Sequence, residues 1–448
     1  MQSLTTENTE ENAMTKCNQA EFVFPSCKSR KVTADFTGGN ISSIGGVMLL
    51  KQADRRLGLI ASAARCIPDP RRQASVTHSV RHMLAQRVFG IACGEEDLND
   101  HDELRNDIAL QAAVGCDAEL ASPSTLCRLE NQVQREAAAA INAIFVEQFI
   151  ASHAVAPKEI ILDFDATDDA VHGEQEGRFF HGYYDHYCFL PLYVFCGSQL
   201  LCAYLRPSKI DGAKHAWAIL ALLVKRIRQA WPEVRIIFRG DSGFCRWRML
   251  RWCDTHGVDY IVGLAKNPRL KAIGAGLMEQ AEATYNETGM KQRLFGEFNY
   301  AAKTWDRERR VIMKAEHSSM GSNPRFIVIS LDGDPQELYD EGYCARGNME
   351  NRIKEQQLDL YADRTSCHKW WANQFRLLLS SLAYILFEHI RRIALQNTRL
   401  ARATSATIRN KLIRIGAMVL KNTRRIRLHL SSACTHQELF AVAAARLE

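Results

Sequence analysis

Three acidic residues, Asp165, Asp241 and Glu350, stand where metal-dependent chemistry would need them. Asp165 and Asp241 each close a short apolar run of strand-forming residues, while Glu350 lies in a segment with helical composition. A carboxylate on such a helix can project sideways toward the two strand ends. Carboxylates gathered at one point repel each other unless cations neutralise them, and hard oxygen ligands suit Mg²⁺ or Mn²⁺. The three residues therefore predict a site for two divalent cations that supports phosphoryl transfer.

The sequence around these acids resembles that of a known enzyme family. The matching strings are LDFDATDDAVHGEQ at 162–175, FRGDSGF at 238–244 and YCARGNME at 343–350. They resemble the DDE transposases of bacterial insertion sequences, of the insertion sequence family 1380 type, which are related to the cut-and-paste transposases with a Y-R-E signature. The resemblance spans nearly the whole chain. It implies an enzyme that cuts the ends of a mobile DNA element and joins them to a target.

The same resemblance implies roles for individual residues. The three acids would be the catalytic metal ligands, and the Y-R-E spacing places Tyr343 and Arg346 ahead of the glutamate as DNA contacts. Lys354, on the same predicted helix, is a further expected DNA contact. The related signature has a lysine seven residues after its glutamate, where this chain has Gln357. One phosphate contact is therefore expected to be missing.

Two of the three ligand assignments have a competitor nearby. Asp163 and Asp165 lie two apart on a predicted strand and face the same side, so either could bind a cation. The Asp-Ala-Thr pattern of the family favours Asp165. Glu355 shares the helix of Glu350, and the spacing from Arg346 favours Glu350.

The order of strand and helix patterns predicts an α/β fold with a ribonuclease H-like core, a mixed five-stranded sheet with flanking helices. A predicted strand ending at Asp165 is followed by an antiparallel hairpin that turns at 197–198, a helix, the strand before Asp241, a second helix and a fifth strand. The first part of this core is expected at 151–270 and its completion at 341–395. The intervening 271–340 is longer than a connection needs and carries strand patterns, which predicts a β-rich insertion domain.

Helical periodicity at 46–150 predicts an N-terminal helical domain, after a polar, partly disordered arm at 1–45. Within the helical domain, Ser122 and Pro123 have the residue types that begin a helix. That helix and the one before it suit a helix-turn-helix element with Arg128 facing DNA, or an ordinary helical hairpin. The two alternatives are equally compatible with the sequence.

The C-terminal segment, 396–448, is basic. From residue 389 to 427 there are eleven Lys or Arg and no Asp or Glu, within a chain of net charge +6. Such a stretch either binds a phosphate backbone or forms a solvated charged face. The expected partner is DNA, both the terminal inverted repeats and the target. A homodimer or a higher assembly on DNA is implied by the resemblance.

The cysteines fit a reducing cytoplasm, and the resemblance implies that this is the cytoplasm of a bacterium, with the protein at the nucleoid when it is bound to DNA. Fourteen cysteines include no Cys-x-x-Cys pair, and the longest apolar run, 375–387, is too short to span a membrane and predicts a buried helix. Two other functions fit the same acids and fold. One is a ribonuclease H-like nuclease without strand transfer, and the other is an inactive DNA-binding protein derived from a transposase.

Overall fold

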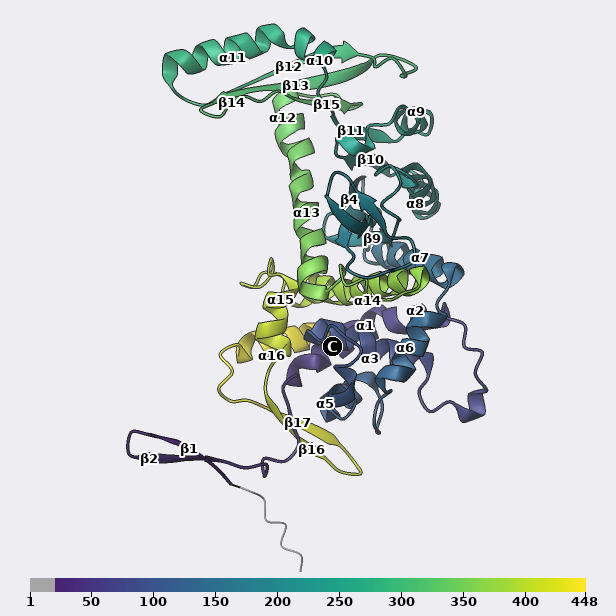
Figure 1. Cartoon of the computed structure of the whole chain (residues 1–448), viewed down its shortest axis with the longest axis vertical. Coiled ribbons are helices and arrows are strands. Elements are labelled where there is room, and N and C mark those ends of the chain that lie inside the picture. Colours follow the sequence, from purple (N-terminus) through teal and green to yellow (C-terminus); the bar gives the residue numbers. More distant parts are fainter. Residues whose placement is uncertain (1–20) are drawn as a thin grey trace, which may run out of the picture.

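The computed structural model describes residues 21–448. A large sheet with its helices stands above a layer of helices, and a single long helix connects the two levels (Figure 1). The first twenty residues of the predicted polar arm, 1–45, lie outside the described residues. From residue 21 onward it forms a β-ribbon that projects from the lower end of the molecule.

The main sheet has nine strands. They are β4 Glu159–Ala166, β8 Leu192–Cys196, β9 Gln199–Tyr204, β10 Arg235–Gly240, β11 Asp259–Leu264, β12 Gln292–Tyr300, β13 Arg309–Ser318, β14 Gly321–Ser322 and β15 Arg325–Ile329. Their order is β12-β13-β15-β11-β10-β4-β8-β9, with β14 paired to β13. β10 is parallel to β4 and β11, whereas the β4–β8, β8–β9 and β11–β15 pairs are antiparallel. The predicted mixed α/β architecture is confirmed.

The strands of the expected insertion, β12, β13 and β15, form where the sequence predicts them and continue this sheet. β15 pairs with β11, matching Val262 with Val328 and Ile261 with Ile329. All four side chains are buried. An unpaired β11 edge would expose backbone donors and acceptors, and β15 satisfies them.

Helices cover the sheet. They are α7 Arg135–Ala151, α8 Ala216–Ala230, α9 Trp247–Thr255, α10 Pro268–Ile273 and α11 Ala275–Thr288. The core beneath them contains Phe164 of β4 and Phe238 of β10, whose rings lie edge to face with centroids 5.2 Å apart. Phe244, just after β10, packs on the same ring of Phe164. The strand ends that carry the predicted ligands are therefore anchored by buried aromatic rings.

The connecting helix begins with α12 (Pro335–Glu337) and continues through α13 (Gly347–Lys354). The turns between these segments, 338–346, and those that follow, 355–359, are helical as well, so that one rod runs from the upper sheet to the helical layer (Figure 1). α13 contacts β4 on the way. This contact brings a residue from far along the chain to the strand that carries Asp165.

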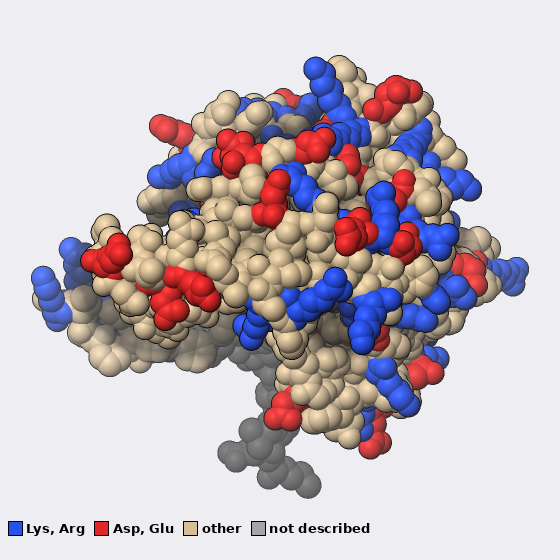
Figure 2. Space-filling view, turned by 90° about the horizontal axis from the view of Figure 1, so that it is seen from above, with Lys and Arg blue, Asp and Glu red and all other residues tan. Residues whose placement is uncertain are grey.

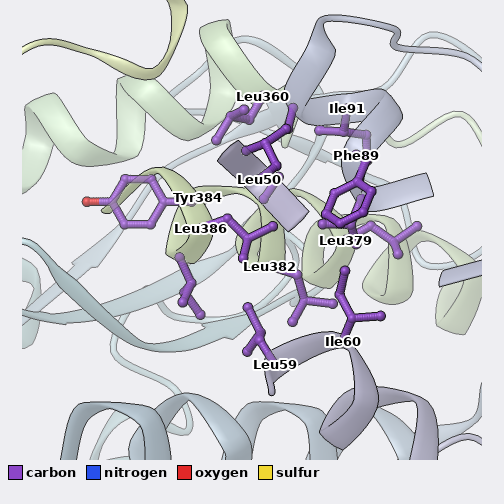
Figure 3. Packing of buried hydrophobic residues seen from close by; sticks show 14 of the residues in the cluster. Leu50, Leu59, Ile60, Phe89, Ile91, Leu360, Leu379, Leu382, Tyr384 and Leu386 are labelled. Carbon is purple, nitrogen blue, oxygen red and sulfur yellow. The ribbon is translucent and has the colours of Figure 1, made fainter. Parts of the chain in front are cut away.

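The helical layer is built around α14 (Trp370–His389), in which every residue from Ala372 onward is buried. The other helices of this layer are α1 Met48–Leu57, α2 Leu59–Arg65, α3 Val80–Cys93, α4 His101–Leu104, α5 Ile108–Val114, α6 Pro123–Gln132, α15 Ser405–Ile408 and α16 Gln437–Leu447. Leu50, Ile60 and Phe89 converge on Leu379 and Leu382 of α14 (Figure 3). The prediction of a buried helix at 375–387 is confirmed. Across residues 21–448, no helix is long and apolar enough to cross a membrane.

Three small β structures complete the fold. The ribbon consists of β1 (Phe22–Cys27) and β2 (Arg30–Ala34), and a second sheet at the lower end has the order β17-β16-β3. The third is formed by the segment that joins β4 to β8 in the sequence, and its strand order is β5-β7-β6. The bounds of the last two groups are β3 Ile41–Ser42, β16 Ala417–Lys421, β17 Ile426–Leu430, β5 Asp169–Ala170, β6 Phe179–His181 and β7 His186–Phe189.

Candidate functional site at the ends of β4 and β10

Asp165 and Asp241 lie at the same end of two neighbouring parallel strands. The register pairs Phe164 of β4 with Gly240 of β10, so the residues that follow, Asp165 and Asp241, are also adjacent. Burial raises the pKa of Asp165 to about 7, with Asp241 and Glu350 adding to the rise and Arg346 opposing it. These influences mean that the charges of all four residues meet at one place.

Arg346 connects two of the three acids. Its guanidinium donates to Oδ2 of Asp165 at 3.2 Å and to Oε1 of Glu350 at 2.7 Å. The arginine precedes Glu350 by one helical turn, so both side chains leave the helix on the side of β4. The structure thus brings the three sequence-predicted acids together, although they come from two strands and a distant helix.

The donor set suits a hard divalent cation. Three carboxylates converge, and carboxylate oxygens are the ligands that Mg²⁺ and Mn²⁺ prefer. Arg346 supplies positive charge between two of them, as a cation would. Among residues 21–448, no group of three His, Cys, Asp or Glu is arranged to hold a metal ion. The three acids fit the expected cations in the chemistry of their oxygen donors.

Asp163 is engaged elsewhere. Its two carboxylate oxygens accept hydrogen bonds from Nε and Nη2 of Arg239 at 2.5 and 2.7 Å, and both side chains are buried. Nη1 of the same arginine donates to the carbonyl oxygen of Gly342 at 2.5 Å. This buried contact links β4, β10 and the connecting helix just below the three acids. It leaves Asp165 as the strand residue that faces the site.

Sequence reasoning missed Arg239 and a second residue, Gly263 of β11. A Cβ at position 263 would stand 2.6 Å from the hydroxyl of Tyr343 and 2.8 Å from the backbone nitrogen of Ser242. The missing side chain therefore lets Tyr343 reach the backbone beside Asp241. A glycine inside an apolar strand often marks such a close approach, and this was the available signal.

Glu355, the alternative to Glu350, and Gln357, which replaces the lysine of the related signature, both make contacts inside the protein. Glu355 is buried, where it pairs with Arg391 and accepts a hydrogen bond from the hydroxyl of Ser405 at 2.6 Å. The side chain amide of Gln357 donates to the buried carboxylate of Asp169 at 2.8 Å. Neither residue points toward the three acids. The position that holds lysine in the related signature makes an internal contact in this chain.

The other predicted DNA contacts lie in two places. Lys354 is exposed on α13, one turn beyond Glu350. Arg128 is exposed on α6 in the lower helical layer and donates to the hydroxyl of Thr125 at 2.9 Å (Figure 1). Ser122 and Pro123 occupy the start of α6, as the sequence predicts. The structure brings Lys354, but not Arg128, to the acids.

The basic C-terminal stretch is partly internal. Arg391 and Arg409 are buried, and Arg409 donates to backbone carbonyl groups of Ala92 and Asp359. By contrast, the three arginines near the tip of the β16–β17 hairpin, at 424, 425 and 427, are exposed. At the opposite end of the molecule, Lys and Arg alternate with Asp and Glu over the visible surface (Figure 2). Positive charge is thus dispersed rather than gathered on that end.

Comparison with known proteins agrees with the resemblance. A family model described as "Transposase DDE domain group 1" matches residues 24–448. One solved structure, "Cryo-EM structure of piggyBac transposase synaptic complex with hairpin DNA (SNHP)", is similar with a TM-score of 0.40 and 11% sequence identity, covering 82% of this chain and 79% of that chain. No curated protein matches the sequence.

Proposed function

Because the chain belongs to the DDE transposase domain family, whose members cut and join DNA, we propose that it is the transposase of a bacterial insertion sequence. In this proposal it performs cut-and-paste transposition, hydrolysing DNA at the element ends and joining the freed ends to a target. The observation that carries the proposal is the meeting of Asp165, Asp241 and Glu350 at the end of two parallel strands. The reaction is inferred from the family, and the choice of catalytic residues is proposed from this geometry.

The three acids are proposed as the catalytic metal ligands. Two divalent cations, Mg²⁺ or Mn²⁺, would when bound activate the attacking water or 3′ hydroxyl and stabilise the charge that develops on the phosphate. Asp165 and Asp241 are fixed by their strands, whereas Glu350 is mounted on a helix and its side chain is 44% exposed. The glutamate is therefore the ligand with most freedom to adjust to the substrate.

Neighbouring residues are proposed to hold the DNA. Arg346 carries a planar guanidinium whose two edges match phosphate oxygens as well as carboxylates, so it suits a contact with the scissile phosphate. Lys354 would bind the backbone one turn further along. Burial raises the pKa of Tyr343 above its usual range, so its hydroxyl stays protonated at neutral pH. This supports a role for Tyr343 as a hydrogen-bond donor to DNA rather than as a nucleophile.

The finer features of the fold are part of the proposal. We interpret β9-β8-β4-β10-β11 as the ribonuclease H-like core, the segment 271–340 as its insertion, and residues 46–150 as a DNA-binding domain in which Arg128 contacts the terminal repeat. The order of these five strands and the flanking helices supports the first interpretation. Two copies on paired DNA ends complete the proposed assembly.

The decisive experiment is cleavage and joining of a duplex that carries the element's own end, with Mg²⁺ or Mn²⁺, comparing the unmodified protein with Asp241→Ala. We expect metal-dependent joining that the substitution abolishes while binding to the end persists. Asp332→Ala is the matched control, because Asp332 is an exposed acid that follows β15. Nicking without joining would support a nuclease instead. Binding without chemistry in any variant would support an inactive DNA-binding protein.

A further inference from the structure

Five Phe or Tyr side chains are gathered within ten residues, 178–187, in the segment that joins β4 to β8, although Phe, Tyr and Trp make up only 8% of the chain. Phe180 and Tyr187 pair across β6 and β7, and their rings lie edge to face with centroids 5.7 Å apart. They are 53% and 47% exposed, and Tyr183, in the turn between the two strands, is 85% exposed. These three rings, here called the aromatic surface, mark an interaction site, because apolar groups gathered at a protein surface usually have a binding role.

The small sheet that carries the aromatic surface is fixed to the elements that carry the three acids. Its first strand, β5, follows Asp168, which comes three residues after Asp165. Oδ2 of Asp168 lies 2.8 Å from Nε2 of His186 in β7. Gln357, two turns beyond Glu350 on the connecting helix, donates to the backbone carbonyl of Asp168 at 3.0 Å. The sheet is therefore attached to both the strand of Asp165 and the helix of Glu350.

Tyr184, the residue after Tyr183, shows how near the sheet is to the acids. Its ring contacts those of His181 and His186, with centroids 4.9 and 6.1 Å apart. Burial raises the pKa of Tyr184 to about 12, and the carboxylates of Asp168 and Asp165 add to the rise. Three extended residues span at most about 11 Å, the length of about three nucleotides in a DNA strand. A DNA strand cut at the acids would thus pass the sheet within a few nucleotides of the cut.

Charge around the aromatic surface is balanced. The guanidinium of Arg178 lies over the ring of Tyr187, 4.8 Å from its centroid. Arg178 also forms an ion pair with Glu174 at 3.6 Å, and Asp185 in the turn is exposed. Such a surface offers little net attraction to a phosphate backbone. It offers exposed ring faces next to an arginine, and these are the groups on which nucleobases stack.

Resting on the proposed function, we propose that the aromatic surface stacks unpaired bases of the DNA strand that is cut at the three acids. In a duplex, neighbouring base pairs cover both faces of each base, so a side chain stacks on a base only where the DNA is opened. Stacking accepts every base, because each base has a flat π face. The proposal therefore deepens the proposed function: it names the surface that holds the DNA open beside the cut.

The test measures DNA binding by the full chain in EDTA, by fluorescence anisotropy with two labelled probes. One probe is a fully paired duplex of the element's own end, and in the other about six nucleotides next to the cut are unpaired, a length that single-strand sites accommodate. The unmodified protein should bind the opened probe about 10-fold more tightly, since stacking of each base strengthens binding by about that factor or more. Phe180→Ser/Tyr187→Ser should remove this preference and leave affinity for the paired probe within about 2-fold.

The matched control is Phe180→Tyr/Tyr187→Phe, which keeps both rings and should keep the preference. Two further readouts separate stacking from a structural or electrostatic role. The fluorescence of 2-aminopurine in the unpaired segment should be quenched by the unmodified protein and by the control, but not by the serine variant. The affinity that the serine variant loses should be the same at about 50 and 200 mM salt, because no phosphate contact is removed. Both side chains are exposed, so the midpoint of thermal unfolding should not change.

Four outcomes would overturn the proposal. Equal binding of the two probes by the unmodified protein would show that the rings bind no opened DNA, as expected of a surface for a protein partner. A serine variant that keeps the preference would place the stacking elsewhere. An equal loss with the paired probe would indicate a structural role, and a loss that shrinks with salt would indicate a contact with the backbone.

Failure of this proposal can be distinguished from failure of the proposed function. Binding is measured in EDTA, without catalysis. Joining of DNA ends by a protein that shows no preference for the opened probe would reject the stacking surface and retain the transposase. A preference without joining would retain the surface and reject the transposase reaction.

Discussion

The buried pair of Asp163 and Arg239 leads to a testable prediction. The sequence allows Asp163 to be a metal ligand, whereas in the structure it forms a buried ion pair with Arg239. Asp163→Asn keeps the shape of the side chain but removes its charge. The guanidinium of Arg239, whose side chain is 7% exposed, then faces one amide oxygen in place of two carboxylate oxygens, and its Nη1 keeps the Gly342 carbonyl. Arginine cannot lose its proton to relieve this. Burial raises the pKa of Asp163 even beside Arg239, so the loss comes from the arginine rather than from the carboxylate. Leaving the buried charge of Arg239 uncompensated costs about 3–5 kcal/mol, so the free energy of unfolding should fall by about that amount.

Urea denaturation followed by tryptophan fluorescence measures this loss. Asp165→Asn is the matched control, because the carboxylate of Asp165 is itself disfavoured by burial and by its acidic neighbours. In metal-free protein at neutral pH, that substitution should leave stability unchanged or increase it. The same two substitutions should act oppositely on Mn²⁺ binding, followed by electron paramagnetic resonance. Asp165→Asn should abolish binding, and Asp163→Asn should weaken it by about 10–100-fold, the usual effect of losing a residue that supports a metal ligand.

A double substitution separates stability from positioning. Asp163→Leu/Arg239→Met replaces both charges by apolar side chains and should restore most of the lost stability. It also removes the contact with Gly342, so joining should stay impaired. The reasoning is refuted if Asp163→Asn changes the free energy of unfolding by less than about 0.5 kcal/mol. It is equally refuted if Asp163→Asn abolishes Mn²⁺ binding as completely as Asp165→Asn does.

Three further predictions concern other parts of the site. Gly263→Ala places a Cβ 2.6 Å from the hydroxyl of Tyr343 and 2.8 Å from the backbone nitrogen of Ser242, so DNA joining should fall by about 100-fold. Gly276→Ala, which has open space around its Cβ, should leave joining unchanged. Lys354→Ala should lower the slope of log affinity for DNA against log salt concentration by about one unit, without altering the midpoint of thermal unfolding. Burial raises the pKa of Asp169 to about 8, and a carboxyl whose folded pKa is raised favours folding below its unfolded pKa and loses that contribution as pH rises. The unfolding midpoint should therefore decline between about pH 4 and pH 8, and Asp169→Asn should flatten this decline; an unchanged profile would show that Asp169 is already ionised in the folded protein.

Local patterns predicted much of this fold because their causes are local. The apolar runs before Asp165 and Asp241 became β4 and β10, and the helix expected between the hairpin and the second of these strands became α8. The apolar stretch at 375–387 became the centre of α14. In α8 the spacing of apolar residues determines which face is buried, whereas the continuous apolar runs of β10 and α14 indicate burial on every side, and their lengths favour a strand and a helix.

Contacts between segments far apart in the chain could not be predicted from the sequence. Nothing in the composition of 271–340 says that β15 pairs with the edge of β11, since an edge strand accepts any strand of suitable register. Gln357 looked like a lost phosphate contact, and only its neighbour in space, the buried carboxylate of Asp169, shows that it makes an internal hydrogen bond. Such pairings depend on the whole fold.

The candidate site was predictable in its residues but not in their arrangement. Each acid could be found by its position after a strand or within a helix, but their convergence depends on Arg239, which reads in the sequence as an ordinary strand residue. Its guanidinium holds Asp163 two residues before Asp165, and Asp241 comes two residues after Arg239, directly beyond the end of β10. The third contact, to the carbonyl of Gly342, joins Arg239 to the helical turns that lead into α13, which carries Glu350. One buried side chain thus joins the two strands and the connecting helix that carry the three acids, and we expect its loss to disturb the chemistry even where the acids themselves are intact.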